Sequence, residues 1–388
     1  MQEQKTNLEK FINSSIEEIR QKMMTICENS YKEELDFQSA IGFIGQVKGL
    51  VSDFGCSVVK GYFESRDEPM AFIESGDKRY LNKGKSTKEV ITSLGKIGIT
   101  RSYYQHRSGG NSLFPLDEKL GIKGELLMPD VKEVVLFSCA YNTPEESSRL
   151  LEKCSFIKLH PTQIKRAVTN TNDFIETTGS GIMESIRKNE TVPESELLVC
   201  SLDGVNVLLN ENGKKKGRPL ERPTSKGNIP SSSYKNVMCG SISHYRITKE
   251  KGEKMPQRVG TKYIARMPEK YYPAFKREFE EEIRSASPDP SVAKLVITDA
   301  HKSISGYFKK HKKFMQYANY AENGWPIGSG VIEAACKSVV KQRMCRSGQR
   351  WSIKGGQAVL NLRAIVKSNR WEGFWNEYTK KYYKKLAA

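Results

Sequence analysis

The chain has 388 residues, which leaves room for two or three domains and excludes a small scaffold held together by disulfides. Its 63 Lys and Arg residues exceed its 45 Asp and Glu residues, and the formal net charge of +18 favours nucleic acid or another polyanion as partner. The eight cysteines include no Cys-x-x-Cys pair, which argues against both a zinc ribbon and a disulfide framework.

Two long amphipathic helices are predicted at the start of the chain. Apolar residues recur at steps of three and four from Leu8 to Ile26 and again from Ile41 to Val58. Gly42, Gly45 and Gly49 interrupt the second pattern and would allow a close helix crossing. The two helices form either a hairpin within the chain, which we favour, or an arm that joins two chains.

A region with short strands follows. Lys78 to Leu81 and Gly98 to Tyr104 have the composition of strands, and a short helix is predicted between them from Ser86 to Leu94. Basic and aromatic residues are interleaved from Arg101 to Arg107, as in a contact to the DNA backbone or in the half-buried edge of a strand. His106 has no partner at ligand spacing, so a structural or surface role is expected.

Three helices are predicted next. They run from Val131 to Cys139, from Pro144 to Lys153 and from Thr162 to Asp173. Their order fits a helix-turn-helix whose third helix presents Lys165 and Arg166 to DNA. A plain three-helix packing unit is the alternative interpretation.

A first acidic strand follows a polar linker that is predicted from Ser180 to Glu196. The apolar run 197–202 ends on Asp203 and Gly204, and an acid at the end of a strand is well placed to hold a metal. An Asp-Gly pair also makes ordinary turns. The basic loop beyond it either contacts DNA or is solvated, and it contains Lys214, Lys215, Lys216 and Arg218.

A second acidic strand lies further along the chain. Strands from Val237 to Tyr245 and from Thr261 to Ala265, then a helix from Tyr271 to Ala286, precede an apolar strand that ends on Asp299. A helix from Lys302 to Lys312 and an extended stretch are expected after it. The predicted order is therefore βββαβ.

A third acid opens the next helix. A glycine-containing loop leads into a helix whose first turn carries Glu333, and Lys337 and Lys341 follow at i+4 and i+8 on the same face, with Arg343 beyond them. An ordinary ion pair at a helix start is the simpler interpretation. Phosphoryl transfer in nucleic acids uses two divalent ions about 3.5–4 Å apart, and a few carboxylates from different elements can hold Mg²⁺.

Several segments in this order resemble bacterial insertion-sequence transposases of the DDE class, specifically the ISKra family. The most specific segments are PIGSGVIEAACK and KQRMCRSGQRWSIKGGQAVLNLRA, and FPLDEKLGI, KSTKEVITSLGKIGITRSYY, LDGV and VITDA also match. The resemblance covers the chain from about Lys85 to Trp375. It implies an RNase-H-like domain of the α+β or α/β class, a mixed sheet with flanking helices, in which Asp203, Asp299 and Glu333 are the catalytic and metal-binding residues.

Two departures from that family affect the expectation. No cysteine pair precedes the PLDE segment, so no zinc is expected. The segment between Asp299 and Glu333 is shorter than in many members. If Phe314 to Tyr320 supplies the fifth strand of the sheet, activity is expected, and if that strand is lost, the protein is a degenerate copy.

Five regions are predicted. They are a helical N-terminal region (1–66), a small β-containing DNA-binding region (67–128), a helical, helix-turn-helix-like DNA-binding region (129–190), an RNase-H-like catalytic domain (191–345) and a helical basic C-terminal region (346–388).

The implied function is a DNA transposase that binds the terminal inverted repeats of its element, cuts strands with two Mg²⁺ or Mn²⁺ ions and joins them to target DNA. A catalytically degenerate, transposase-derived DNA-binding protein is the alternative, and a structure-specific nuclease is a third. The expected partners are double-stranded DNA and further copies of the chain, as a dimer or larger. The polar start of the chain and the lack of a long apolar run predict a cytoplasmic protein without a membrane partner. The expected DNA partner implies association with the bacterial nucleoid.

Overall fold

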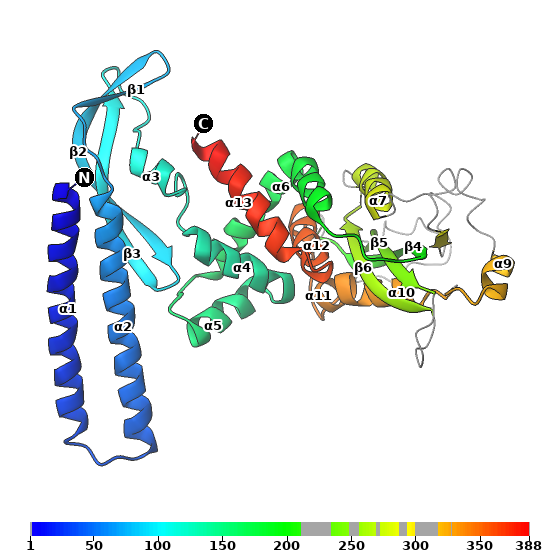
Figure 1. Ribbon diagram of the computed structural model, residues 1–388, viewed down its shortest axis with the longest axis horizontal. Helices are drawn as coiled ribbons and strands as arrows, with labels where there is room; N and C mark the ends of the chain where they lie inside the picture. Colours follow the sequence, from blue (N-terminus) through cyan, green and yellow to red (C-terminus); the bar gives the residue numbers. More distant parts are fainter. Residues whose placement is uncertain are drawn as a thin grey trace, which may run out of the picture. The chain divides into compact units, whose positions relative to one another are not determined.

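The structure is a computed structural model, and it describes residues 2–210, 234–247, 256–268, 272–286, 293–298, 317–326 and 328–387. It is a mixed α+β chain whose described strands form two sheets (Figure 1). The chain divides into two compact units. Unit 1 comprises Met1–Val135, Pro144–Ile164 and Thr379–Ala388, and unit 2 comprises Leu136–Thr143 and Lys165–Tyr378.

Unit 1 begins with a helical hairpin. Helices α1 (Gln2–Ser30) and α2 (Phe37–Ser65) lie side by side, so the predicted hairpin within the chain is confirmed. The two helices pack tightly at Gly61, where an added Cβ would lie 2.3 Å from Phe11 Cε1. The three glycines expected at the crossing do not serve it, because a Cβ on Gly42, Gly45 or Gly49 would meet no heavy atom of the described chain within 4 Å.

The first sheet is antiparallel and has the order β1-β2-β3, with bounds β1 (Phe72–Ser75), β2 (Lys78–Thr92) and β3 (Gly95–His106). The helix predicted from Ser86 to Leu94 is wrong, because β2 continues through Thr92 and pairs with β3 along its length. Val90 is fully buried with Ile99 in a core that α2 also joins. Packing of these β-branched residues therefore decides in favour of the strand.

The basic and aromatic cluster of β3 is partly buried. Arg101 is 4% exposed, and its guanidinium holds Asp117 with Nε–Oδ1 and Nη2–Oδ2 distances of 2.7 and 3.0 Å. Asp117 lies on α3 (Pro115–Lys119). Tyr104 is 1% exposed, and its hydroxyl accepts the backbone N–H of Met70. Of the two interpretations of this cluster, a contact to the DNA backbone or a half-buried strand, the buried side chains of Arg101 and Tyr104 fit the second.

Three helices follow in chain order, as predicted: α4 (Pro129–Tyr141), α5 (Pro144–Cys154) and α6 (Pro161–Asn189). The third is much longer than expected. The predicted linker from Ser180 is helical as far as Asn189, because Ile182 and Ile186 bury one apolar position per turn. Whether these helices bind DNA stays a prediction.

The second sheet, in unit 2, has the order β6-β5-β4-β7. Strands β4 (Leu197–Leu208), β5 (Tyr234–Arg246) and β6 (Gln257–Arg266) form an antiparallel meander, whereas β7 (Ala293–Thr298) pairs with β4 in parallel. Helix α7 (Tyr272–Ala286) precedes β7 in the chain. The predicted βββαβ order is confirmed.

Helices cover both faces of this sheet. On one face, Leu198, Cys200 and Leu202 of β4 pack against Phe275 and Phe279 of α7. On the other face, Val205 and Val207 pack against a helix that begins at α10 (Gly330–Ala335), continues as the π-helix η4 (Cys336–Lys341) and ends with α11 (Gln342–Met344). This second core also contains Leu360 of α12 (Ile353–Lys367).

Two elements complete the described chain, α9 (Tyr317–Glu322) and α13 (Trp371–Ala387). The alternative in which Phe314 to Tyr320 supplies a fifth strand does not hold for residues 317–320, which are helical. Its first residues, and the helix predicted from Lys302 to Lys312, lie outside the described residues. No described helix combines the length and apolar composition that crossing a membrane requires.

Candidate active site

Asp203 lies within β4, in the middle of the second sheet. The strand is predicted from the sequence to end at this acid, but it continues to Leu208. Asp203-Gly204 therefore forms no turn, and Val205 and Val207 continue the buried face. A Cβ added at Gly204 would lie 2.3 Å from Oδ1 of the Asn236 side chain on β5, so that side chain would have to move. By strand alternation, the Asp203 side chain shares the face that α10 and η4 cover.

The two carboxylate oxygens of Asp203 have different donors. Oδ1 accepts the backbone N–H of Gly204 at 2.6 Å, and Oδ2 lies 3.6 Å from the thiol of Cys336, which donates to it. Cys239 of β5 is directly opposite Asp203 in the strand register. Its hydrogen bond to Cys336, followed by burial and the neighbouring negative charge, raises the pKa of Cys239 well above its ordinary value. This thiol is therefore neutral and able to donate.

Glu333 lies on the exposed side of α10. Ile332 and Ala335 bury the opposite side in the core of the sheet, which fixes how the helix is rotated. Ser329, the residue before the helix, donates its hydroxyl to Glu333 Oε1. Cys336, which contacts Asp203, comes three residues after Glu333, so the residue that Asp203 touches lies about one helical turn beyond Glu333. π-Helical turns such as η4 are frequent at functional sites.

Asp299 lies outside the described residues, but the strand before it is described. β7 pairs with β4 in parallel, and its last residue, Thr298, is the register partner of Leu202. Leu202 directly precedes Asp203, and Thr298 directly precedes Asp299. The paired strands thus lead toward the two sequence positions that carry aspartate.

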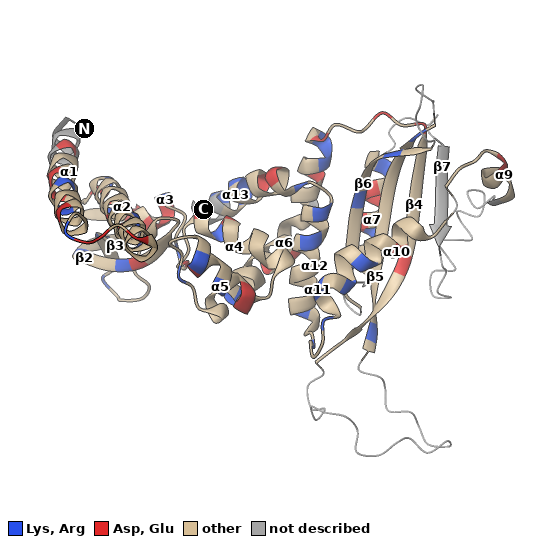
Figure 2. Cartoon of the chain, turned by 90° about the horizontal axis from the view of Figure 1, so that it is seen from below, with Lys and Arg blue, Asp and Glu red and all other residues tan. Residues whose placement is uncertain are grey.

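The predicted DNA contacts fall into three groups. Lys165 and Arg166 on α6, and Lys337 and Lys341 on η4, are exposed; Figure 2 marks basic positions along these helices. Lys214, Lys215, Lys216 and Arg218 lie outside the described residues. Arg343 is 2% exposed, with its guanidinium 4.9 Å from the Trp351 ring centre. It is removed from the proposed contacts, because a buried side chain does not present its charge to phosphate.

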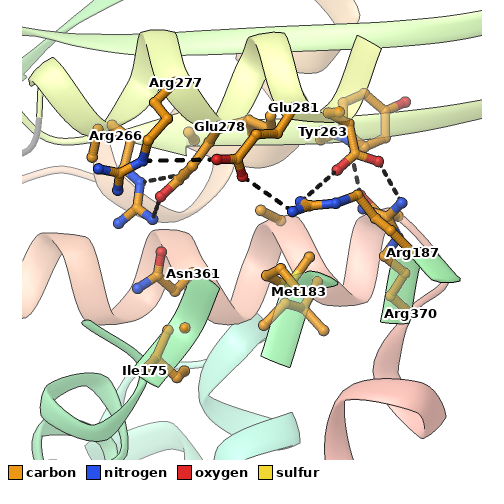
Figure 3. A pocket seen from close by; sticks show the side chains of 18 of the residues that line it. Ile175, Met183, Arg187, Tyr263, Arg266, Arg277, Glu278, Glu281, Asn361 and Arg370 are labelled. Atoms are coloured by element: carbon orange, nitrogen blue, oxygen red, sulfur yellow. Dashed lines mark hydrogen bonds and ion pairs between the residues drawn. The ribbon is translucent and has the colours of Figure 1, made fainter. Parts of the chain in front are cut away.

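A second candidate site is a cavity of about 140 Å³ in unit 2, bordered by α6, β6, α7 and α12 (Figure 3). Its charged groups are occupied with one another. Arg266 Nε donates to Glu278 Oε2 at 2.8 Å, and Arg187 Nη2 lies 3.1 Å from Glu281 Oε2. Burial and the charge of Arg370 lower the pKa of Lys262, beside this network, to about 8. The network joins helices to the sheet and offers no unpaired catalytic group among the residues named.

The carboxylate groups around Asp203 are ligands of the kind that a divalent ion with a preference for oxygen would take. Asp203 and Glu333 supply carboxylates, and the Cys336 thiol donates to one of them rather than acting as a ligand. Within the described ranges, no three His, Cys, Asp or Glu side chains are grouped to hold a metal. The expected set therefore depends on Asp299, the third oxygen ligand of the prediction.

Residues that the sequence did not single out complete the site: Ser329, Cys239 and Cys336. Cys336 could have been found, because it is one helical turn after Glu333. Cys239 could not, because its place opposite Asp203 depends on the register between two strands.

Comparison with known proteins gives one partial match. Residues 40–171 match the model of an uncharacterised protein family, UPF0236. That segment ends before β4 and contains none of the three acids. No curated protein matches the chain.

Proposed function

We propose that this chain is a DDE-type DNA transposase, of the ISKra type that its sequence resembles, with an RNase-H-like catalytic domain in unit 2. The observation that carries the proposal is the parallel register of Leu202 with Thr298, each directly followed by an aspartate. The mixed sheet and the helix that carries Glu333 support it.

The proposed roles follow from the chemistry of each group. Asp203, Asp299 and Glu333 would hold Mg²⁺ or Mn²⁺ through carboxylate oxygens. When bound, such ions activate an attacking hydroxyl and stabilise the leaving 3′ oxygen. Gly204 and Ser329 would orient the first and third carboxylates through the hydrogen bonds already described.

The basic side chains would act on the substrate before any cut. Lys337 and Lys341 are exposed on the turns that follow Glu333. They would hold phosphates of the DNA end beside the acids, and Lys165 and Arg166 would contact DNA elsewhere. Double-stranded element ends and target DNA are the proposed partners, with two or more copies of the chain on paired ends.

A direct test is to incubate the full chain with labelled DNA carrying the ends of its own element, with Mg²⁺ or Mn²⁺. Cleavage and joining that require the metal would support the proposal. Specific binding with no cleavage would favour the degenerate DNA-binding protein, the alternative that the helical residues 317–320 support, because they do not supply a fifth strand. Cleavage governed by DNA shape rather than by end sequence would favour a structure-specific nuclease.

A further inference from the structure

The Asp203 carboxylate is held on both oxygens by groups of the chain itself. Oδ1 accepts from the backbone of Gly204 at 2.6 Å, and Oδ2 faces the Cys336 thiol at 3.6 Å. A carboxylate oxygen can accept about two hydrogen bonds or metal contacts, so each oxygen keeps capacity for a metal. The two donors restrict the rotation of the carboxylate without filling it.

Cys336 is itself fixed from several sides. It is 1% exposed and packs among Ala335, Val339 and Val340 in the core beneath the helix. Its position at the junction of α10 and η4 ties it to the turn that carries Glu333. The side chain cannot leave Asp203 without disturbing this core.

Cys239 supports Cys336 from the sheet. It is 0% exposed, is the register partner of Asp203, and hydrogen-bonds to Cys336. The three side chains therefore form a short row from β5 through the helix to β4. Because both thiols are buried, neither is placed as a nucleophile or as a solvent-facing redox group.

We propose that Cys336, supported by Cys239, is a positioning residue that orients the Asp203 carboxylate for metal binding. This inference rests on the proposed function, because it assigns the thiols a task at that site. Partners that orient metal ligands commonly change metal affinity about 10–100-fold when they are removed. A thiol is a weak donor, so we expect an effect of about 5–10-fold, at or just below the lower limit of that range.

The test measures Mn²⁺ binding by electron paramagnetic resonance of the free ion, on the full chain without DNA. Cys336→Val fills the space without a donor, whereas Cys336→Ser keeps one. We expect Cys336→Val to weaken Mn²⁺ binding about 5–10-fold and Cys336→Ser to remain within about 2-fold of the natural chain. Cys239→Ala should fall between them. Cys336→Ala replaces the valine variant if that variant does not fold.

The matched control is Cys200→Ala. Cys200 is a buried thiol of the same strand, but it packs on the opposite face with α7. Its loss should lower thermal stability and leave Mn²⁺ affinity unchanged. If Cys200→Ala weakens Mn²⁺ binding as much as Cys336→Val does, the loss of affinity comes from disturbed packing in general, and the inference is overturned.

Cleavage assays separate this inference from the proposed function. A positioning role predicts that Cys336→Val raises the Mn²⁺ concentration needed for half-maximal cleavage, while the rate at saturating Mn²⁺ stays within about 3-fold. Unchanged Mn²⁺ affinity in Cys336→Val, with a large loss in Asp203→Asn, would overturn the inference and keep the function. Unchanged affinity and cleavage in Asp203→Asn would overturn both.

Discussion

Leu202 on β4 and Thr298 on β7 are register partners in a parallel pair of strands, and each is directly followed in the sequence by an aspartate. The pairing of these two strands thus relates two sequence positions that are more than ninety residues apart. It is the structural basis of the proposed catalytic site.

The ion pair of Arg101 with Asp117 should be essential to unit 1. Asp117→Ala leaves a guanidinium that is 4% exposed without its carboxylate, and we expect a loss of about 3–5 kcal/mol in the free energy of unfolding. Urea denaturation measures it. The neighbouring Glu118→Ala is the control: Glu118 pairs with Lys123 at 2.8 Å at the surface, and its removal should change stability by less than about 1 kcal/mol. Equal losses in the two variants would contradict this account.

Alanine substitutions at two glycines of α2, Gly45 and Gly61, should change stability in opposite directions. Gly45→Ala adds a methyl group into open space within a helix, so we expect a gain of about 0.5–1 kcal/mol. Gly61→Ala brings a Cβ to 2.3 Å from Phe11 Cε1 and should destabilise the hairpin. Thermal unfolding followed by circular dichroism compares the two. A stabilising Gly61→Ala would show that α1 does not pack on α2 at this point.

Of the three basic residues after Glu333, Lys337 and Lys341 should affect the salt dependence of DNA binding, whereas Arg343 should affect stability. Lys337→Gln and Lys341→Gln should each reduce the slope of log affinity against log salt concentration by about 1, because each lysine is exposed and would release a counterion. Arg343→Gln should leave that slope unchanged and lower stability, because Arg343 is buried against Trp351. Fluorescence anisotropy with DNA at several salt concentrations measures both properties.

The control for these substitutions is Lys96→Gln. Lys96 is an exposed lysine of unit 1, paired with Glu89 at 2.7 Å and outside the proposed DNA contacts. The slope of log affinity against log salt concentration for Lys96→Gln should equal that of the natural chain. If all four substitutions change the slope equally, the basic residues act through overall charge and not through a local contact.

Much of the order of elements could be predicted from the sequence, because apolar periodicity records which faces are buried. The βββαβ order and the helix that carries Glu333 follow from such patterns. Local composition predicts a helix from Ser86 to Leu94, but the β-branched residues of this segment favour a strand once β3 pairs with it. Local composition is a weak guide where pairing decides.

The site was less accessible to sequence reasoning, because it depends on register and packing. Asp203 and Glu333 could be selected from their places near a strand and at a helix start, but Cys239 lies opposite Asp203 only through strand pairing. Arg343 was expected at the surface because charge on a helix usually is, whereas the helix buries it beside Trp351. Burial of a single charged side chain depends on tertiary contacts that the pattern of one helix does not contain.

The most direct measurement is metal-dependent cleavage of the element's own DNA ends by the natural chain and by Asp203→Asn, Asp299→Asn and Glu333→Gln. Loss of several kcal/mol of metal stabilisation should slow cleavage by about 10³-fold or more in each variant. Glu322→Gln, which changes an exposed carboxylate of α9, should cleave at the natural rate. Cleavage that survives in all three acid variants would contradict the assigned site.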